Sequence, residues 1–238
     1  MPNKHIIAIG GGGLGRNKGE EAMCRYIMSH ARTKTPKAQG LKALFIGTAT
    51  GDRYDYMSSM YQWFNKQGVL MNHLPLFTRT PVDVEAFILE HDIVYVGGGN
   101  TKSMLAVWKD WGVDKALKKA YDQGIVLCGV SAGAICWFEH GLTDSWDVDL
   151  NVLPCLGFLK GSMAPHYDSE KDRRPSFHKF LKSGEIMDGY AAEEDVAIHF
   201  VDGKLHKVVS YKEGQKAYAL KANLDNLEEP LQVEMLDV

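Results

Sequence analysis

Hydrophobic positions along the chain form two alternating patterns, short apolar runs and longer stretches with helical spacing. An apolar run bounded by glycine or polar residues predicts a buried strand, whereas apolar residues three and four positions apart predict an amphipathic helix. The predicted strands are 5–10, 41–47, 69–77, 92–96 and 125–128, and the predicted helices are 20–32, 54–67, 81–90, 101–108 and 113–123. Continuous apolar strands that alternate with helices favour a parallel sheet covered on both faces.

The last third of the chain has a different character. Two strand-like runs within 197–209 flank Asp202-Gly203, a dipeptide typical of a β-hairpin turn. The segments 216–221 and 231–236 predict further edge strands. We therefore expect an α/β fold: a mostly parallel, flavodoxin-like sheet with helices on both faces and a C-terminal antiparallel extension. The length of 238 residues suits one such unit, so residues 1–238 are predicted to form a single domain.

Composition and charge exclude several classes of function. The net charge of −3 and the lack of a basic stripe give no footprint for nucleic acid. The longest apolar stretches are strand-sized, which predicts no membrane partner, and the N-terminus shows no signal-peptide pattern. No two cysteines form a C-x-x-C pair, which favours reduced core residues of a cytoplasmic protein over disulfides or a zinc site. The four cysteines are Cys24, Cys128, Cys136 and Cys155.

The most informative segment runs from an apolar strand through Gly129-Val130-Ser131-Ala132-Gly133 into a predicted helix at 134–138. This is the G-x-S-x-G pattern of a nucleophile elbow, in the strand–turn–helix context that the elbow requires. Glycines two positions on either side of Ser131 keep a sharp turn free of side chains. The alternative is an ordinary strand-to-helix turn whose serine caps the helix.

Ser131 would need a base, because a serine hydroxyl is a poor nucleophile until an imidazole takes its proton. His166 is the best candidate among nine histidines, since it follows the apolar run 157–163, where a strand would enter a loop at the edge of the sheet. Five other histidines in predicted strands or helices are more simply surface or packing residues: His5, His30, His91, His199 and His206.

A third member would be a carboxylate that orients the imidazole. The residues alone leave this choice open among Asp144, Asp147, Asp149, Asp168 and the run Glu193-Glu194-Asp195. That run lies at the edge of a predicted strand, where a solvated acidic loop is the simpler alternative.

Two glycine runs offer backbone N–H groups to a ligand. Gly97-Gly98-Gly99-Asn100-Thr101 follows a strand and opens a helix, which suits an oxyanion hole completed by the N–H of Ala132, although a phosphate-binding loop or a tight turn has the same pattern. Residues 10–15 formally match G-x-G-x-x-G. Four residues separate these glycines from the helix, and no acid follows the second strand to bind a ribose. We interpret the run as an active-site or structural loop and expect no cofactor.

Four segments, in order through most of the chain, resemble the peptidase E and cyanophycinase family of serine peptidases: Gly-Gly-Gly-Asn-Thr at 97–101, Gly-Val-Ser-Ala-Gly-Ala at 129–134, Pro-His-Tyr at 165–167 and Ala-Glu-Glu-Asp-Val-Ala at 192–197. The resemblance implies a class I glutamine amidotransferase-like fold in which serine replaces the cysteine nucleophile. It also implies hydrolysis of a peptide or related amide bond without a metal or cofactor. At the matching positions it implies the nucleophile Ser131, the base His166 and the oxyanion donors Gly99 and Ala132.

The same resemblance favours Glu194 as the carboxylate, with Glu193 as its immediate rival. Asp144 and Asp147 lie between the serine and the histidine without an obvious match to the family pattern. Well-known members of the family recognise an aspartyl residue, which makes Arg174, just after the base, and Asn100 candidate substrate-binding residues. A solvated charge run at 170–174 is the alternative reading of that arginine.

The leading hypothesis is therefore a cytoplasmic serine peptidase, monomeric or homodimeric, that cleaves a small peptide such as an aspartyl dipeptide through an acyl-enzyme on Ser131. A non-catalytic binding module that holds a small anion at 97–101 is the alternative. A nucleotide-binding oxidoreductase using residues 10–15 is a third, weaker one.

Overall fold

The computed structural model describes residues 2–12, 19–32 and 40–238. Its larger sheet has eight strands in the order β14-β11-β10-β1-β5-β4-β2-β3. Strands β1 to β5 are mutually parallel, and β10 and β11 add an antiparallel extension at the β1 side. The strands are β1 (His5–Ile9), β2 (Lys42–Ile46), β3 (Leu70–His73), β4 (Ile93–Val96), β5 (Val126–Val130), β10 (Val196–Val201), β11 (Lys204–Ser210) and β14 (Val233–Met235).

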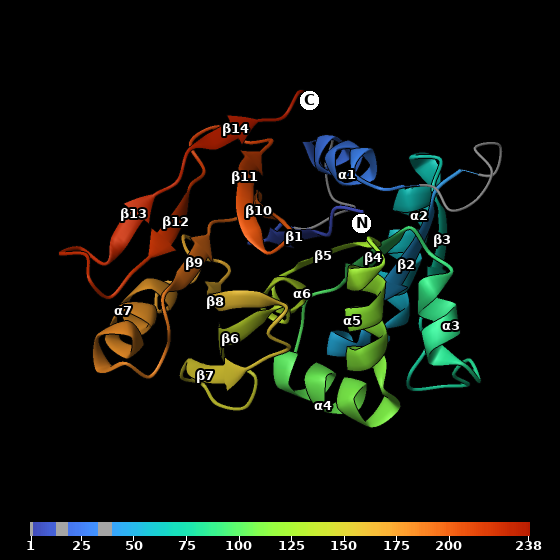
Figure 1. Cartoon of the computed structure of the whole chain (residues 1–238), viewed down its shortest axis with the longest axis horizontal. Coiled ribbons are helices and arrows are strands. Elements are labelled where there is room, and N and C mark those ends of the chain that lie inside the picture. The colour runs from blue at the N-terminus through green and yellow to red at the C-terminus, as the bar shows by residue number, and fades with distance from the viewer. Residues whose placement is uncertain (1, 13–18, 33–39) are drawn as a thin grey trace.

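Helices cover both faces of this sheet, because successive side chains of a strand point to opposite sides. Ile7 and Ile9 of β1 pack with α1 (Gly19–Ser29) and α2 (Tyr54–Lys66). Ile6 and Ala8 pack on the other side, with four other helices. Figure 1 shows α4 and α5 on one side of the parallel strands and α1 on the other. The helices on the side of Ile6 and Ala8 are α3 (Val84–Leu89), α4 (Thr101–Trp111), α5 (Val113–Asp122) and α6 (Ala132–Ile135). The predicted α/β class, with its antiparallel extension, is confirmed.

A second sheet of six strands, in the order β13-β12-β9-β8-β6-β7, lies beside the first and was not predicted as a separate sheet. Helix α7 (Arg173–Ser183) packs against it through Phe177 and Leu181, and Figure 1 shows this helix at the edge of the molecule. The two expected edge strands divide between the sheets, with β12 in the smaller one and β14 in the larger. The strands are β6 (Phe138–Thr143), β7 (Asn151–Pro154), β8 (Leu159–Ala164), β9 (Gly189–Ala192), β12 (Ala217–Leu220) and β13 (Glu228–Pro230).

Several element boundaries differ from the sequence-based expectation for identifiable reasons. The predicted strand 69–77 ends at His73, because the Asp52 carboxylate accepts the N–H groups of Leu76 and Phe77 at 2.7 and 3.3 Å and so takes them out of the ladder. The predicted helix 134–138 is instead the short α6, and Phe138 already begins β6. A short apolar run fits a helix or a strand equally well, and here packing of the second sheet decides.

The predicted hairpin is confirmed. Asp202 and Gly203 have φ values of 51° and 78°, as a type I′ turn requires, and they join β10 to β11. Within the described ranges, the helices are all too short or too polar to cross a bilayer.

Candidate active site

Ser131 sits at a strained turn between β5 and α6. Its backbone has φ 56° and ψ −113°, a combination that non-glycine residues avoid. The Ser131 N–H donates to the carbonyl of Ile9 at 3.2 Å, and the Ser131 carbonyl accepts the N–H groups of Ala134 and Ile135 at 2.8 and 2.9 Å. The neighbouring strand and the following helix thus hold the turn, which has the geometry of a nucleophile elbow.

The two glycines of the motif are required by close packing of backbone. A Cβ at Gly129 would lie 2.5 Å from the carbonyl oxygen of Gly133 and 2.6 Å from that of Val96. A Cβ at Gly133 would lie 2.2 Å from the same Val96 oxygen. Any side chain at these positions would push α6 away from β4, and the serine would lose its position.

His166 and Glu194 form a close pair in the same region. His166 follows β8 and has a φ of 54°, and its N–H donates to the carbonyl of Gly10 at 3.0 Å. Its Nδ1 lies 2.5 Å from Oε1 of Glu194, which also accepts the Ser169 hydroxyl at 2.8 Å. The hydrogen bond from His166, reinforced by the one from Ser169, lowers the pKa of Glu194 to about 2 despite partial burial. Glu194 is therefore a carboxylate at neutral pH, in contact with the imidazole of His166.

Glu194 lies in the turn between β9 and β10, which is fixed by a small polar network. The Glu194 N–H donates to Oδ1 of Asp168 at 2.9 Å. The Gln215 amide donates to Oδ2 of Asp168 at 3.1 Å and to the carbonyl of Glu194 at 2.8 Å. Gly11 packs directly on the carboxylate, since a Cβ there would lie 2.2 Å from Oε2 of Glu194. The described part of the first glycine run thus makes room for the acid, and positions 13–15 lie outside the described residues.

Ser131, His166 and Glu194 line one cavity of about 560 Å³. The start of α2 and the residues just before it also line this cavity. These wall residues are Thr50, Arg53, Asp55, Tyr56 and Ser59. Arg53 brings a guanidinium to the cavity, paired with Asp55 at 2.5 Å in an exposed ion pair.

Of the two predicted oxyanion donors, Gly99 lines this cavity, and Ala132 directly follows Ser131 in the chain. Gly98 also lines the cavity, and a Cβ at Gly98 would lie only 3.2 Å from Cβ of Ser131. Gly99 has a φ of 137°, and a side chain there would lie 2.4 Å from the carbonyl of Ala49. Among the described residues, no backbone acceptor takes the N–H of Gly99 or of Ala132. The hydrogen bonds of the described backbone therefore do not use these two N–H groups.

Two predicted substrate-binding residues lie away from the cavity. Asn100 is the N-cap of α4: its Oδ1 accepts the N–H of Ser103 at 2.8 Å and its Nδ2 donates to the carbonyl of Ser145 at 2.6 Å. The Arg174 guanidinium stacks over the rings of Tyr167 and Tyr218, at 4.6 and 4.9 Å from their centroids. It pairs with Glu228 at 3.1 Å. The structure thus gives both side chains partners within the fold.

The rival carboxylates face other partners. Glu193 is buried and accepts the N–H of Lys216 at 2.8 Å and the hydroxyl of Tyr218 at 3.3 Å. Asp144 and Asp147 are exposed, and the Asp147 carboxylate accepts the N–H of Val148. Of the acids that the sequence leaves open, the one that contacts His166 in the described structure is Glu194.

Cys128, the thiol nearest to the elbow in sequence, is fully buried within β5. Its Sγ lies 3.4 Å from the carbonyl of Val94, and burial raises its thiol pKa well above the ordinary value. A thiol in this state is inert as a nucleophile.

Sequence reasoning missed the residues that complete the cavity. Arg53, Tyr56 and Ser59 lie at the start of α2, whose sequence has an ordinary helical pattern. That pattern does not indicate that the first turn of the helix lines the cavity next to Ser131. Ser169 follows His166 by three residues, and that short spacing after the base is the signal that could have drawn attention to it.

The fold and the site together define an α/β protein with an elbow serine and a histidine–carboxylate pair at the carboxyl ends of parallel strands. The model of peptidase family S51 matches residues 6–208, and the chain belongs to this family of peptidases. The predicted resemblance to peptidase E-like proteins is thereby confirmed.

One curated relative and two solved structures match most of the chain. The "Uncharacterized peptidase YgaJ" of Bacillus subtilis (strain 168) is 42% identical over 234 residues, covering 98% of this chain and 99% of that protein. A solved peptidase from an acI-B1 Actinobacterium superposes with a TM-score of 0.71 at 17% identity, covering 97% of this chain and 94% of that one. A "Putative Peptidase E Protein" from Listeria monocytogenes EGD-e gives a TM-score of 0.64 at 19% identity, covering 88% of this chain and 100% of that one.

Proposed function

We propose that this peptidase is of the serine type, with Ser131 as nucleophile, His166 as general base and Glu194 as the residue that orients the base. The 2.5 Å contact between Nδ1 of His166 and Oε1 of Glu194, in the cavity that Ser131 also lines, is the observation that carries the proposal. A carboxylate on Nδ1 fixes the tautomer whose Nε2 is free to accept a proton.

The reaction follows from these positions. Nε2 of His166 takes the proton of the Ser131 hydroxyl as Oγ bonds to the scissile carbonyl carbon, and Glu194 stabilises the imidazolium that results. The N–H groups of Gly99 and Ala132 bind the oxyanion. When the C–N bond breaks, the imidazolium gives its proton to the leaving amine. Water, deprotonated by His166, then attacks the acyl ester and regenerates the Ser131 hydroxyl.

The substrate we propose is a small peptide with a carboxylate near the scissile bond, such as an aspartyl dipeptide. Arg53 supports this choice, because it brings a guanidinium to the cavity wall. Its present partner Asp55 is exposed, so the ion pair is weak and a substrate carboxylate can exchange for it.

Labelling with a serine-directed phosphonate tests the nucleophile. The wild-type protein is expected to take up one label per chain, and Ser131→Ala none. Ser59→Ala is the matched control, since Ser59 lines the same cavity and should be dispensable for labelling. A dipeptide library with varied first residues, assayed on the same three proteins, reports the substrate preference. Labelling of Ser131→Ala at the wild-type rate would refute the proposal.

A further inference from the structure

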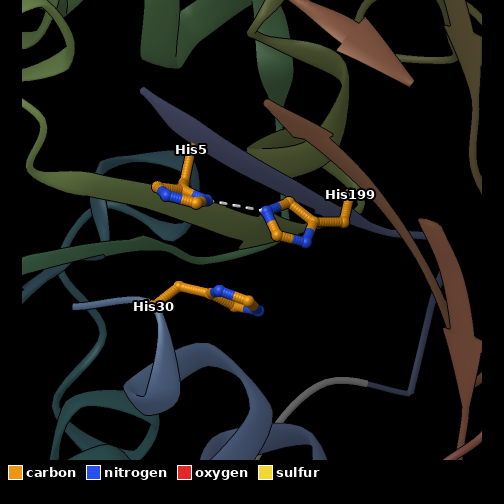
Figure 2. Close-up of side chains that lie close together, drawn as sticks. All are labelled: His5, His30 and His199. Carbon is orange, nitrogen blue, oxygen red and sulfur yellow. Dashed lines mark hydrogen bonds between the residues drawn. The ribbon is translucent and has the colours of Figure 1, made fainter. Parts of the chain in front are cut away.

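A cluster of three histidines lies outside the active site, on the face of the larger sheet that α1 covers. His5 begins β1, His199 lies in the middle of β10, and His30 directly follows α1. Figure 2 shows the three rings facing a common space, with His5 and His199 above His30. Each ring offers one nitrogen, and these three nitrogens lie within 4.8 Å of one another.

Regular secondary structure brings the rings together. β1 and β10 are antiparallel neighbours in which Ile7 pairs with His199, so His5 and His199 lie diagonally across one strand pair on the same face. α1 packs on that face, and its C-terminal end delivers His30. The ring centroid of His30 lies 5.1 Å from that of His5 and 4.5 Å from that of His199.

The spacing is close to that of ligands around one ion. Nδ1 of His5 and Nε2 of His199 are 3.0 Å apart and share a hydrogen bond, so a bound ion would take the place of the proton between them. Two imidazole nitrogens bound to one tetrahedral Zn²⁺, each about 2.0–2.1 Å from the metal, are separated by about 3.3 Å. The two strand histidines therefore need almost no movement, and the third nitrogen needs to approach by at most about 1.5 Å, which side-chain rotation provides.

The third histidine of the cluster has a ring nitrogen without a partner in the described part of the chain. Nε2 of His30 is buried and has no hydrogen-bond partner among the described residues. Nδ1 of His199 lies 2.7 Å from the hydroxyl of Tyr26. The nitrogen that His199 would offer to a metal ion is therefore Nε2. Such a bond on the far nitrogen is typical of the residue that orients a metal-bound histidine.

We propose that His5, His30 and His199 form a binding site for a divalent transition-metal ion, with Zn²⁺ as the natural candidate, that is separate from the catalytic cavity. Three imidazoles and no thiolate or carboxylate suit Zn²⁺ and related ions and disfavour Mg²⁺ or Ca²⁺. The nearby Lys207 ammonium is paired with Glu234 at 2.7 Å, which offsets its repulsion of a cation.

The ion would act as a clamp between elements. It would tie the C-terminal end of α1 to β1 and β10, and so fix the helix over the face of the sheet that it covers. Binding to the folded chain alone would raise the temperature of unfolding, because the separated histidines of an unfolded chain do not form a site. None of the proposed chemistry at Ser131 depends on this ion.

Zn²⁺ alone, added to chelator-treated full-length protein, tests the site. Calorimetric titration is expected to show one ion per chain, and excess Zn²⁺ is expected to raise the unfolding temperature by about 5 °C. His30→Gln is the informative variant, because His30 lies at the end of a helix and its replacement spares the buried His199. We expect this variant to bind Zn²⁺ at least tenfold more weakly and to lose the thermal shift.

Two control variants separate this site from other histidines. His73→Ala removes a partly buried histidine of the same sheet that is bonded to a tyrosine, Tyr61, at 2.9 Å, and it should bind Zn²⁺ like the wild type. His166→Ala should do the same, which separates the cluster from the catalytic base. Equal Zn²⁺ affinity of His30→Gln and the wild type would overturn the proposal, as would loss of binding in His166→Ala.

Discussion

The strands β1 and β10 run side by side between two sites of opposite construction. At one end, Gly10 and Gly11 follow β1 and pack against the turn that carries Glu194. At the other end, β1 begins with His5, which faces His199 of β10 across the ladder. The same pair of strands thus supports the candidate catalytic site and the histidine cluster.

The two ends differ in backbone conformation. Around the cavity, Ser131, His166 and Asp195 all have positive φ values, between 54° and 64°. In the cluster, neither His5 nor His199 has a positive φ, although the pairing of β10 with β11 shifts register between His199 and Phe200. Side chains on one face of a strand pair can converge on an ion without distortion, whereas an exposed nucleophile, its base and the oxyanion donors need positions that regular strands and helices do not offer.

The largest expected effect comes from substituting one polar group at each end. Glu194→Gln leaves a hydrogen-bonding group beside His166 but removes the charge that stabilises the imidazolium, so kcat should fall about a thousandfold or more. His5→Gln, at the other end of the same strand pair, should leave kcat within about twofold. Peptide hydrolysis by both variants, with circular dichroism to verify folding, measures the contrast. Equal losses would show that the two ends are not functionally separate.

Gly11→Ala probes the close approach of β1 to the acid. The new Cβ would lie 2.2 Å from the Glu194 carboxylate and must displace it. A displacement of about 1 Å in a catalytic group costs roughly a hundredfold in rate, so kcat should fall by that order. Gly112→Ala, where the new Cβ meets nothing within 4 Å but φ is 69°, should lower stability and leave kcat unchanged. An active Gly11→Ala enzyme would indicate that the acid tolerates movement.

A smaller test compares two arginines, Arg53 at the cavity and Arg174 away from it. Arg53→Met should raise KM for an acidic dipeptide about tenfold with little change in kcat, because only binding of the substrate carboxylate is lost. Arg174→Met should leave KM unchanged and lower the free energy of unfolding by about 1 kcal/mol, through loss of its pairing with Glu228. Steady-state kinetics give the KM of both variants, and chemical denaturation gives their free energies of unfolding. A higher KM in Arg174→Met alone would mean that Arg174, and not Arg53, binds the substrate carboxylate.

The parts of the fold that were predictable are those with strong local signals. The parallel strands and their helices follow from apolar periodicity, and the hairpin follows from Asp202-Gly203. The second sheet escaped prediction because polar residues and glycines interrupt the apolar pattern of its strands, as in β8, where Gly161 with a φ of 83° stands in the middle. Its pairings join distant segments, which no local pattern encodes.

The site divides in the same way. Ser131 is recognisable from glycine spacing alone, and its elbow exists because those glycines lie against β4. The choice of Glu194 over Glu193 depends on which side of one turn each side chain leaves the backbone, and residue types do not reveal this. Likewise, the three clustered histidines are far apart in sequence, and only strand pairing and helix packing bring them together.

The smallest expected effect is a difference in acid stability between wild type and Glu194→Gln. The pKa of Glu194 is about 2 in the folded protein and has an ordinary value of 4.5, so the carboxylate stabilises the fold above pH 4.5 and this contribution is lost as the pH falls to 2. Because the group is partly exposed, we expect a contribution of about 1 kcal/mol or less. Urea unfolding of both proteins from pH 6 to pH 2 should show wild type more stable at the upper end, with the gap closing downward. A gap independent of pH would mean that the His166–Glu194 contact stabilises the turn by packing and not by charge. In this respect the active-site end would then resemble the histidine end, where rings pack together.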